Sequence, residues 1–318
     1  MYSPNKIRNS ILLAAAAIIW GFAFVAQSTG GDAVGPYAFN SIRNYIAVIA
    51  LIPVILVRDK IGASAPSKTP AERRTLLITG ITCGIALCVA STIQQVGITM
   101  GTPSGKAGFL TATYIVIIPI AGIFMKKHCG WNVWIGAFFM LIGIYLLCIE
   151  GEFTITPSDR LIILCAFCFA VQIMLIDMTV KSQDPVRVSQ IEFLTTAILA
   201  TPLAFFFDMG HSLSGIRTWA LCLTRADAWI SILFAGILSS AVAYTFQMVG
   251  QQGINPTIAS MLMSMESMFA VIGGWLILGE YLSLREICGC IIMFAAIILA
   301  QLPLSKAGSK TSEPEPVR

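Results

Sequence analysis

Two stretches of this sequence, Val89-Ala90-Ser91-Thr92-Ile93-Gln94-Gln95-Val96-Gly97 and Val242-Ala243-Tyr244-Thr245-Phe246-Gln247-Met248-Val249-Gly250, resemble each other closely. A shift of 153 residues aligns them and also aligns Pro103 with Pro256. Seven of the fifteen positions from 89 to 103 are then identical, more than two unrelated apolar helices would share. Further along, the same shift pairs Gly136 with Gly289 and Met140 with Met293. These matches indicate that the chain consists of two related halves.

The composition places both halves in a membrane. Of the 318 residues, 57% are hydrophobic and only 11% are charged, and the mean hydropathy is +0.83. A soluble protein needs roughly a quarter of its residues charged to cover its surface. A secreted, disordered or nucleic-acid-binding protein is therefore excluded. The nine cysteines fall mostly in apolar runs, where cysteine acts as a small hydrophobic residue.

Ten apolar runs are long enough to cross a bilayer, and backbone in lipid must form helices because no water satisfies its polar groups. We predict an all-α membrane protein with spans at 9–27, 36–57, 76–97, 103–125, 131–149, 159–180, 188–207, 227–249, 255–278 and 285–303. Polar hinges are expected between them, at Gly30-Gly31-Asp32, 58–74, Lys126-Lys127-His128, Glu150-Gly151-Glu152 and 208–227. The first run has no cleavage site after it and is interpreted as a helix, not as a removed signal.

The positive charges predict the orientation of these helices. Fourteen lysines and arginines fall on the side that holds both termini, and four arginines fall on the other. Both termini are therefore expected in the cytoplasm, which requires an even number of helices. We predict one five-helix repeat over residues 1–150, a second over 151–304 and a disordered tail over 305–318. Because five is odd, the second repeat must insert upside down. Inverted repeats place a substrate site at their interface near the midplane.

The sequence resembles the EamA family of the drug/metabolite transporter superfamily. The resemblance covers residues 9–303 and rests on Ile19-Trp20-Gly21-Phe22, Phe39-Asn40-Ser41-Ile42-Arg43, Lys106-Ala107-Gly108-Phe109-Leu110 running to Pro119, and Glu266-Ser267 leading to Leu278-Gly279-Glu280. It implies ten helices in two repeats. It also implies transport, mostly outward, of amino acids, other metabolites or drugs. The resemblance is specific for the fold and weak for the substrate.

Ionisable groups within membrane helices are costly, so each is a candidate functional residue. Glu266 lies eleven residues into its predicted helix, close to the midplane. It either holds a proton or binds an amine, or it forms an internal hydrogen-bonded contact with a neighbouring helix. Under the 153-residue shift its counterpart is Thr113, so the two halves differ in charge at this depth.

The other intramembrane charges are expected nearer the two ends of the bundle. Arg43 lies seven residues into its helix, in the outer half, and either hydrogen-bonds carbonyls or pairs with a carboxylate. Lys106 lies about one turn inside the outer end, where it either binds or gates a substrate or extends its amine to the interface. Glu192 lies about one turn inside the cytoplasmic end, so it is not paired with Lys106. A shift of 149 residues places Arg43 on Glu192.

Uncharged candidates complete the predicted site. Gln94 and Gln247 occupy equivalent positions of the repeat, and glutamines in membrane helices either bridge helices or line a wet cavity. Trp20, Tyr114 and Tyr244 could form an aromatic wall for an apolar side chain, or could serve ordinary packing.

Other chemistries lack their signatures. No phosphate-binding loop of the Walker type is present, so ATP-driven transport would need a separate subunit. The only histidines, His128 and His211, lie in predicted loops, and no Ser/His/Asp arrangement is visible. We therefore expect neither an enzyme nor a cofactor.

The sequence favours a secondary transporter of the cytoplasmic membrane that exports a small metabolite, an amino acid or related compound, by alternating access. Transport is either facilitated or driven by proton exchange at Glu266. The alternatives are an exporter of cationic or lipophilic drugs and, from a different class, a channel or a membrane scaffold. The expected partners are a small-molecule substrate, membrane lipid and, in the proton-driven alternative, protons as coupling ion, with no nucleic acid; the oligomeric state stays open.

Overall fold

The computed structural model describes residues 4–64, 69–124, 130–149, 155–180, 183–273 and 283–302. On these residues, helices occupy each of the ten predicted spans, apart from some span ends and the short interruptions described below. Eight helical segments in this part of the chain are long and apolar enough to cross a membrane, and Trp131–Leu147 is a shorter apolar helix. The prediction of an all-α membrane fold is confirmed.

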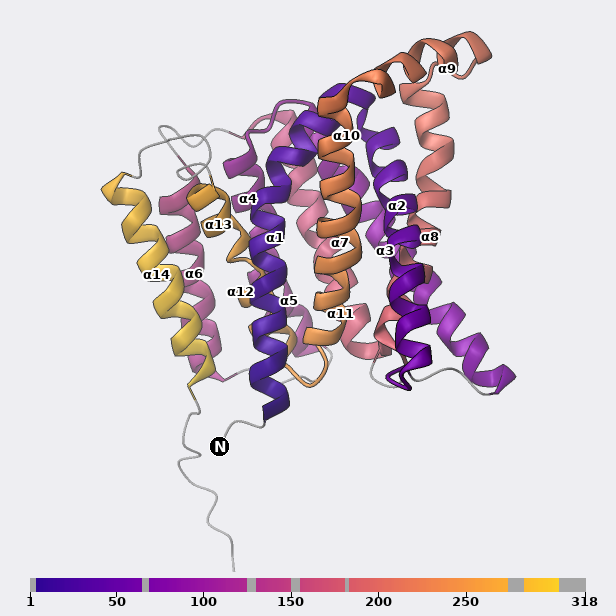
Figure 1. Cartoon of the computed structure of the whole chain (residues 1–318). Coiled ribbons are helices and arrows are strands. Elements are labelled where there is room, and N and C mark those ends of the chain that lie inside the picture. The colour runs from indigo at the N-terminus through magenta and orange to yellow at the C-terminus, as the bar shows by residue number, and fades with distance from the viewer. Residues whose placement is uncertain are drawn as a thin grey trace, which may run out of the picture.

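The first repeat contains α1 (Pro4–Val34), α2 (Pro36–Lys60), α3 (Pro70–Thr99), α4 (Ser104–Ala112), α5 (Tyr114–Phe124) and α6 (Trp131–Cys148). The second contains α7 (Pro157–Thr179), α8 (Pro185–Leu203), η2 (Ala204–Asp208), α9 (Leu213–Ala220), η3 (Leu221–Thr224), α10 (Ala226–Leu233), η4 (Phe234–Tyr244), α11 (Thr245–Gly250), α12 (Pro256–Met263), α13 (Glu266–Gly273) and α14 (Leu284–Gln301). Helix α1 begins and α14 ends at the same face of the bundle, the lower one in Figure 1. We call it the terminal face, and the other the opposite face.

Each half packs mainly against the other half. Helices α2 and α3 contact α8, α3 also contacts α7, and α1 contacts η4, α11 and α13. At one side of the bundle in Figure 1, α6 and α14 lie against each other. One buried apolar cluster extends from Leu13 of α1 to Ala300 of α14. A pocket between the halves is therefore lined by both repeats.

The hinge predicted at Gly30-Gly31-Asp32 is wrong, because these residues continue α1 as far as Val34. The glycines serve close packing instead of a turn. A Cβ atom on Gly31 would lie 2.5 Å from Nε2 of Gln95 and 2.6 Å from Oγ1 of Thr99 in α3. Gln95 Nε2 uses that space to donate a hydrogen bond of 2.7 Å to the carbonyl of Gln27.

The other predicted hinges have different outcomes. The segment from 58 to 74 is shorter than expected, since Arg58 and Lys60 end α2 and a Thr69–Glu72 capping box begins α3. The connection from 208 to 227 contains α9, which extends away from the bundle at the opposite face in Figure 1. The hinges at 126–128 and 150–152 lie outside the described residues.

Two of the predicted spans are interrupted at equivalent places. Thr113 separates α4 from α5, and Ser264-Met265 separates α12 from α13. Each interruption contains a hydrogen bond between residues three apart, as in a 3₁₀ turn. The amide of Thr113 donates to the carbonyl of Leu110, and the amide of Met265 donates to the carbonyl of Leu262, each at 3.3 Å. In a membrane, such irregular backbone is tolerated only where it is buried in protein or lines a cavity.

The contact between α6 and α14 generates a stability prediction. A Cβ atom on Gly143 would lie 2.6 Å from Cγ of Met293 and 2.9 Å from the carbonyl oxygen of Gly289. Gly143→Val should lower the free energy of unfolding by roughly 1–3 kcal/mol through overpacking. Thermal unfolding in detergent, followed by tryptophan fluorescence, measures the effect. The control Phe138→Leu changes an exposed residue of the same helix and should shift the midpoint little; equal midpoints for both variants would refute the close contact.

Candidate functional site

A pocket lies between the two repeats, at the interrupted helices. It holds about 500 Å³ of empty space, part of it open to solvent. Both halves contribute side chains, and of the fifteen lining residues seven are apolar or aromatic and eight are polar or charged. The lining residues are Trp20, Phe24, Gln27, Arg43, Gln94, Thr111, Tyr114, Phe169, Gln172, Ile173, Ser239, Tyr244, Gln247, Met263 and Glu266.

Seven of the eight predicted site residues line this pocket. They are Trp20, Arg43, Gln94, Tyr114, Tyr244, Gln247 and Glu266. Lys106 is not among the lining residues. The geometry therefore brings together the residues that the sequence singled out, and their role in binding stays a prediction.

An aromatic pair forms one wall. The rings of Trp20 and Tyr244 meet edge to face with their centroids 4.9 Å apart. The indole Nε1 of Trp20 donates a hydrogen bond of 3.1 Å to the carbonyl of Ser239. Ser239 lies in η4, whose π-helical backbone has a wider turn than an α-helix. The wall thus joins α1 of the first repeat to η4 of the second.

Arg43 brings a positive charge to the pocket, although only 3% of its surface is exposed. Its Nε donates a hydrogen bond of 3.0 Å to Oδ1 of Asn40, one turn earlier in α2. Asn40 in turn donates to Ser91 Oγ at 3.1 Å and Thr92 Oγ1 at 2.9 Å in α3. Among the described residues, no carboxylate forms an ion pair with Arg43. Its guanidinium carbon also lies 5.7 Å from the centroid of the Phe39 ring, so the side chain is held in place without an anionic partner in this part of the chain.

Glu266 brings the negative charge. It is the first residue of α13, directly after the interruption, and is 7% exposed. Within the described part of the chain, its carboxyl group has neither a hydrogen-bond nor an ion-pair partner, so the internal contact that the sequence left open is not seen there. A buried carboxylate without a partner is costly, so a binding or coupling role for Glu266 stays a prediction.

The glutamines both bridge helices and line the pocket, so the two interpretations of them hold together. Gln94 Nε2 donates a hydrogen bond of 3.1 Å to Oγ1 of Thr111 in α4. Gln247 Nε2 donates one of 3.2 Å to Oε1 of Gln172, and Gln172 Nε2 donates one of 3.0 Å to Oε1 of Glu192. The chain of amides connects the pocket to a buried carboxyl group of α8.

Lys106 forms an ion pair at the opposite face and not in the pocket. Its Nζ lies 2.6 Å from Oδ2 of Asp159, at the start of α7. Asp159 also accepts hydrogen bonds from Thr102 Oγ1 at 3.2 Å and from the amide of Thr156 at 2.7 Å. The pair joins α4 of the first repeat to α7 of the second.

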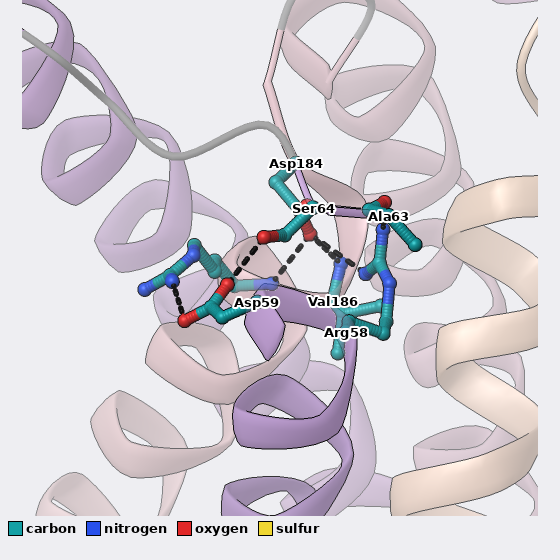
Figure 2. Close-up of polar contacts among 7 residues, drawn as sticks. Arg58, Asp59, Ala63, Ser64, Asp184 and Val186 are labelled. Atoms are coloured by element: carbon teal, nitrogen blue, oxygen red, sulfur yellow. Dashed lines mark hydrogen bonds and ion pairs between the residues drawn. The ribbon is translucent and has the colours of Figure 1, made fainter. Parts of the chain in front are cut away.

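A second set of ion pairs joins α2 to α8 at the terminal face (Figure 2). Arg58 Nη1 lies 3.0 Å from Oδ1 of Asp184, and Arg187 Nη2 lies 2.6 Å from Oδ2 of Asp59. Asp184 also caps α8 by accepting from the amides of Val186 at 3.0 Å and Arg187 at 3.3 Å. Both faces of the bundle thus carry ion pairs between the repeats.

The sequence reasoning missed several of these residues. The capping box Thr156–Asp159 was a signal for Asp159, but its pairing with Lys106 depends on how the halves dock. Gln172 and Ser239 carried no signal beyond being polar in an apolar run. Glu192 was placed too near the end of its helix, because α8 begins at Pro185 and not at 188. In the described residues, no group of three or more metal-ligating side chains comes together.

These features define a multi-pass membrane transporter, and the comparisons with known proteins specify its family. The EamA-like transporter family matches the chain twice, over residues 8–149 and 157–302, one match for each repeat. The chain belongs to this family.

Individual relatives agree with this assignment. An "Uncharacterized transporter" of Archaeoglobus fulgidus is 26% identical over 304 residues, which cover 94% of this chain and 87% of the relative. The "Uncharacterized transporter YwfM" of Bacillus subtilis is 24% identical over 315 residues and 96% of each chain. A protein of known crystal structure shares 16% identity and superposes with a TM-score of 0.73 over 92% of this chain and 96% of its own, which shows the fold alone.

The two sets of ion pairs predict unequal contributions to stability. Lys106→Met leaves the carboxylate of Asp159, whose side chain is 1% exposed, without its cation and should lower the free energy of unfolding by about 3 kcal/mol. The control Arg187→Met breaks a pair whose side chains are 28% and 35% exposed, and should cost about 0–1 kcal/mol. Thermal unfolding in detergent compares them. A larger loss for Arg187→Met would contradict the assignment of the buried pair.

Proposed function

We propose that this transporter carries small zwitterionic metabolites, amino acids and related compounds, outward across the cytoplasmic membrane. One observation supports this: Arg43 and Glu266 line the same pocket, and neither has an ion-pair partner among the described residues. A zwitterion presents a carboxylate to the arginine and an ammonium group to the glutamate. Binding then supplies both buried charges with partners, and the Trp20–Tyr244 wall faces the apolar part of the molecule.

The same observation argues against the drug-export alternative. A cationic lipophilic compound would pair with Glu266 but would place a second positive charge in the pocket with Arg43. Like charges repel strongly at low dielectric. A zwitterion avoids this repulsion, so the charge pattern favours a metabolite with two opposite charges.

Alternating access supplies the mechanism, with the two sets of ion pairs as gates. The outer gate is Lys106–Asp159, and the inner gate comprises Arg58–Asp184 and Arg187–Asp59. Each links a helix of one repeat to a helix of the other, so rocking of the repeats separates one set while the other stays formed. The excess of lysine and arginine at the terminal face supports a cytoplasmic location for it. Lys106 thus acts as a gate residue in this proposal.

Proteoliposomes loaded with the twenty L-amino acids and a set of small amines test the proposed substrate class. Efflux is measured by mass spectrometry, with empty liposomes as the blank. Selective loss of amino acids is the expected result. Selective loss of the amines would favour the drug exporter, and no loss from folded protein would favour a scaffold. Single-channel conductance above the turnover of a carrier would indicate a channel.

Substitutions of the two charged pocket residues should weaken substrate binding more than they lower the stability of the fold. Glu266→Gln and Arg43→Met each remove one charge-assisted contact worth about 1.5–3 kcal/mol, so KM for the transported amino acids should rise roughly 10- to 100-fold. Efflux kinetics measure the change. The control Glu286→Gln alters a carboxylate that caps α14 and does not line the pocket, and it should leave KM unchanged. Unchanged KM in both pocket variants would exclude the zwitterion site.

A further inference from the structure

Helix α8 carries a second intramembrane carboxyl group, Glu192, which does not line the pocket and has no exposed surface. Asp184 caps α8 and Pro185 begins it, so Glu192 is the eighth helical residue, about 12 Å along the axis from the cap. It packs against α3 so closely that a Cβ atom on Gly84 would lie 2.7 Å from its carbonyl oxygen. The pocket mechanism described above leaves this buried group without a role.

Two glutamines connect Glu192 to the pocket. Oε1 of Glu192 accepts from Nε2 of Gln172, and Oε1 of Gln172 accepts from Nε2 of Gln247. Both glutamines line the pocket, and both are buried. The hydrogen bonds therefore run in one direction, from the pocket toward the carboxylate, across α11, α7 and α8.

We call the hydrogen-bonded chain Glu192–Gln172–Gln247 the relay. Both of its ends have unused hydrogen-bonding capacity. Oε2 of Glu192 and Oε1 of Gln247 are buried acceptors without a partner in the described residues. An ionised carboxylate only accepts hydrogen bonds, so it holds both amides with their NH₂ groups toward α8. This leaves the carbonyl of Gln247 as the free acceptor at the pocket end.

Binding of one proton reverses the relay. The protonated carboxyl group gains an O–H donor, which can donate to Oε1 of Gln172 after that amide rotates. Gln172 then donates to Oε1 of Gln247, and the NH₂ group of Gln247 is left free at the pocket end. When Glu192 is ionised, Gln247 presents its carbonyl oxygen, a hydrogen-bond acceptor, to an ammonium group in the pocket. When Glu192 is protonated, Gln247 presents its NH₂ group, a donor, which does not bind an ammonium group. Proton and amine therefore oppose each other's binding.

The ionisable groups that face Glu192 in the described residues do not prevent its carboxyl group from gaining and losing a proton. The thiol of Cys83 on α3 and the hydroxyl of Tyr244 on η4 lie within electrostatic reach of it. Arg43 on α2 interacts with Tyr244 and forms no ion pair with Glu192. Helix α11 offers no ionisable side chain, and in η2 Asp208 accepts from the amide of Ala38. No cation in the described residues neutralises Glu192.

We propose that Glu192, and not Glu266, is the proton-coupling residue, and that the Gln172–Gln247 relay makes proton and substrate exchange with each other. The inference rests on the proposed function. In the inward-open state the carboxylic acid releases its proton to the cytoplasm and an amino acid binds. In the outward-open state the amino acid leaves and a proton binds the carboxylate. The ion pairs of the inner gate lie at the cytoplasmic end of the same helix and control access to Glu192.

Two assays on proteoliposomes loaded with the twenty L-amino acids test this inference. The first measures exchange of internal for external amino acids at equal pH, and the second measures efflux with an acidic exterior. Wild-type efflux should be at least fivefold faster with the pH gradient. Glu192→Gln keeps a carbonyl oxygen that can accept from Gln172 Nε2, so it should keep equal-pH exchange within about threefold, and it cannot take up a proton, so it should lose the acceleration. The comparison variant Glu266→Gln should raise KM and keep the acceleration.

Each other outcome would overturn the inference. Acceleration retained in Glu192→Gln removes the coupling role, and loss of equal-pH exchange in folded Glu192→Gln assigns the residue to structure or binding. Wild-type efflux that is no faster with the pH gradient refutes the coupling and leaves the proposed substrate class intact. No wild-type exchange at all refutes that class and this inference with it. Should Glu192→Gln fail to fold, Glu192→Asp serves instead: a shifted pH profile of efflux supports the coupling role, and an unshifted profile refutes it.

Discussion

The absence of hydrogen-bonding partners in hydrocarbon is the constraint on which this structure depends. It makes every span helical, and it allows interruptions only where protein or a cavity encloses the freed groups. The two interruptions, at Thr113 and at Ser264-Met265, occur at equivalent places of the two repeats and flank the pocket. They put Tyr114 and Glu266 at the starts of new helices on its wall. The helix interruptions, which would be destabilising if they faced lipid, thus form part of the pocket wall.

The same constraint explains where the charges lie. The buried charges at the two ends of the bundle are paired, as in Lys106–Asp159 and Arg58–Asp184, and each pair connects the repeats. Arg43 and Glu266, which line the pocket, and the buried Glu192 of α8 have no ionic partner among the described residues. A transporter needs contacts at its ends that form and break in turn, and central groups whose partner is the substrate. This division between paired ends and an unpaired centre is what the proposed mechanism uses.

Much of this arrangement could be predicted from the sequence, because periodicity and burial are local properties. Apolar runs marked the spans. Charged and amide side chains within these runs marked four of the pocket residues, and aromatic side chains marked three more. The predictions failed where contacts with neighbouring helices decide the role of a residue. Gly30 and Gly31 were interpreted as a hinge, although their missing Cβ atoms admit Phe39 and Gln95. For Lys106, the sequence did not decide between binding or gating a substrate and extending the amine to the membrane interface. Nothing near Lys106 in sequence indicates that its Nζ lies 2.6 Å from Oδ2 of Asp159, 53 residues away.

The sequence by itself determined the membrane class, the repeat and its inversion, since hydropathy, length and internal similarity need no knowledge of contacts. It also carried the charge difference between Thr113 and Glu266 at matching depth. Only the tertiary structure decided which polar groups meet: it placed Arg43 and Glu266 on one pocket and joined Gln247 to Glu192 through Gln172. The physical reason is that such contacts arise between helices distant in sequence, where close packing of the two halves determines which side chains face each other.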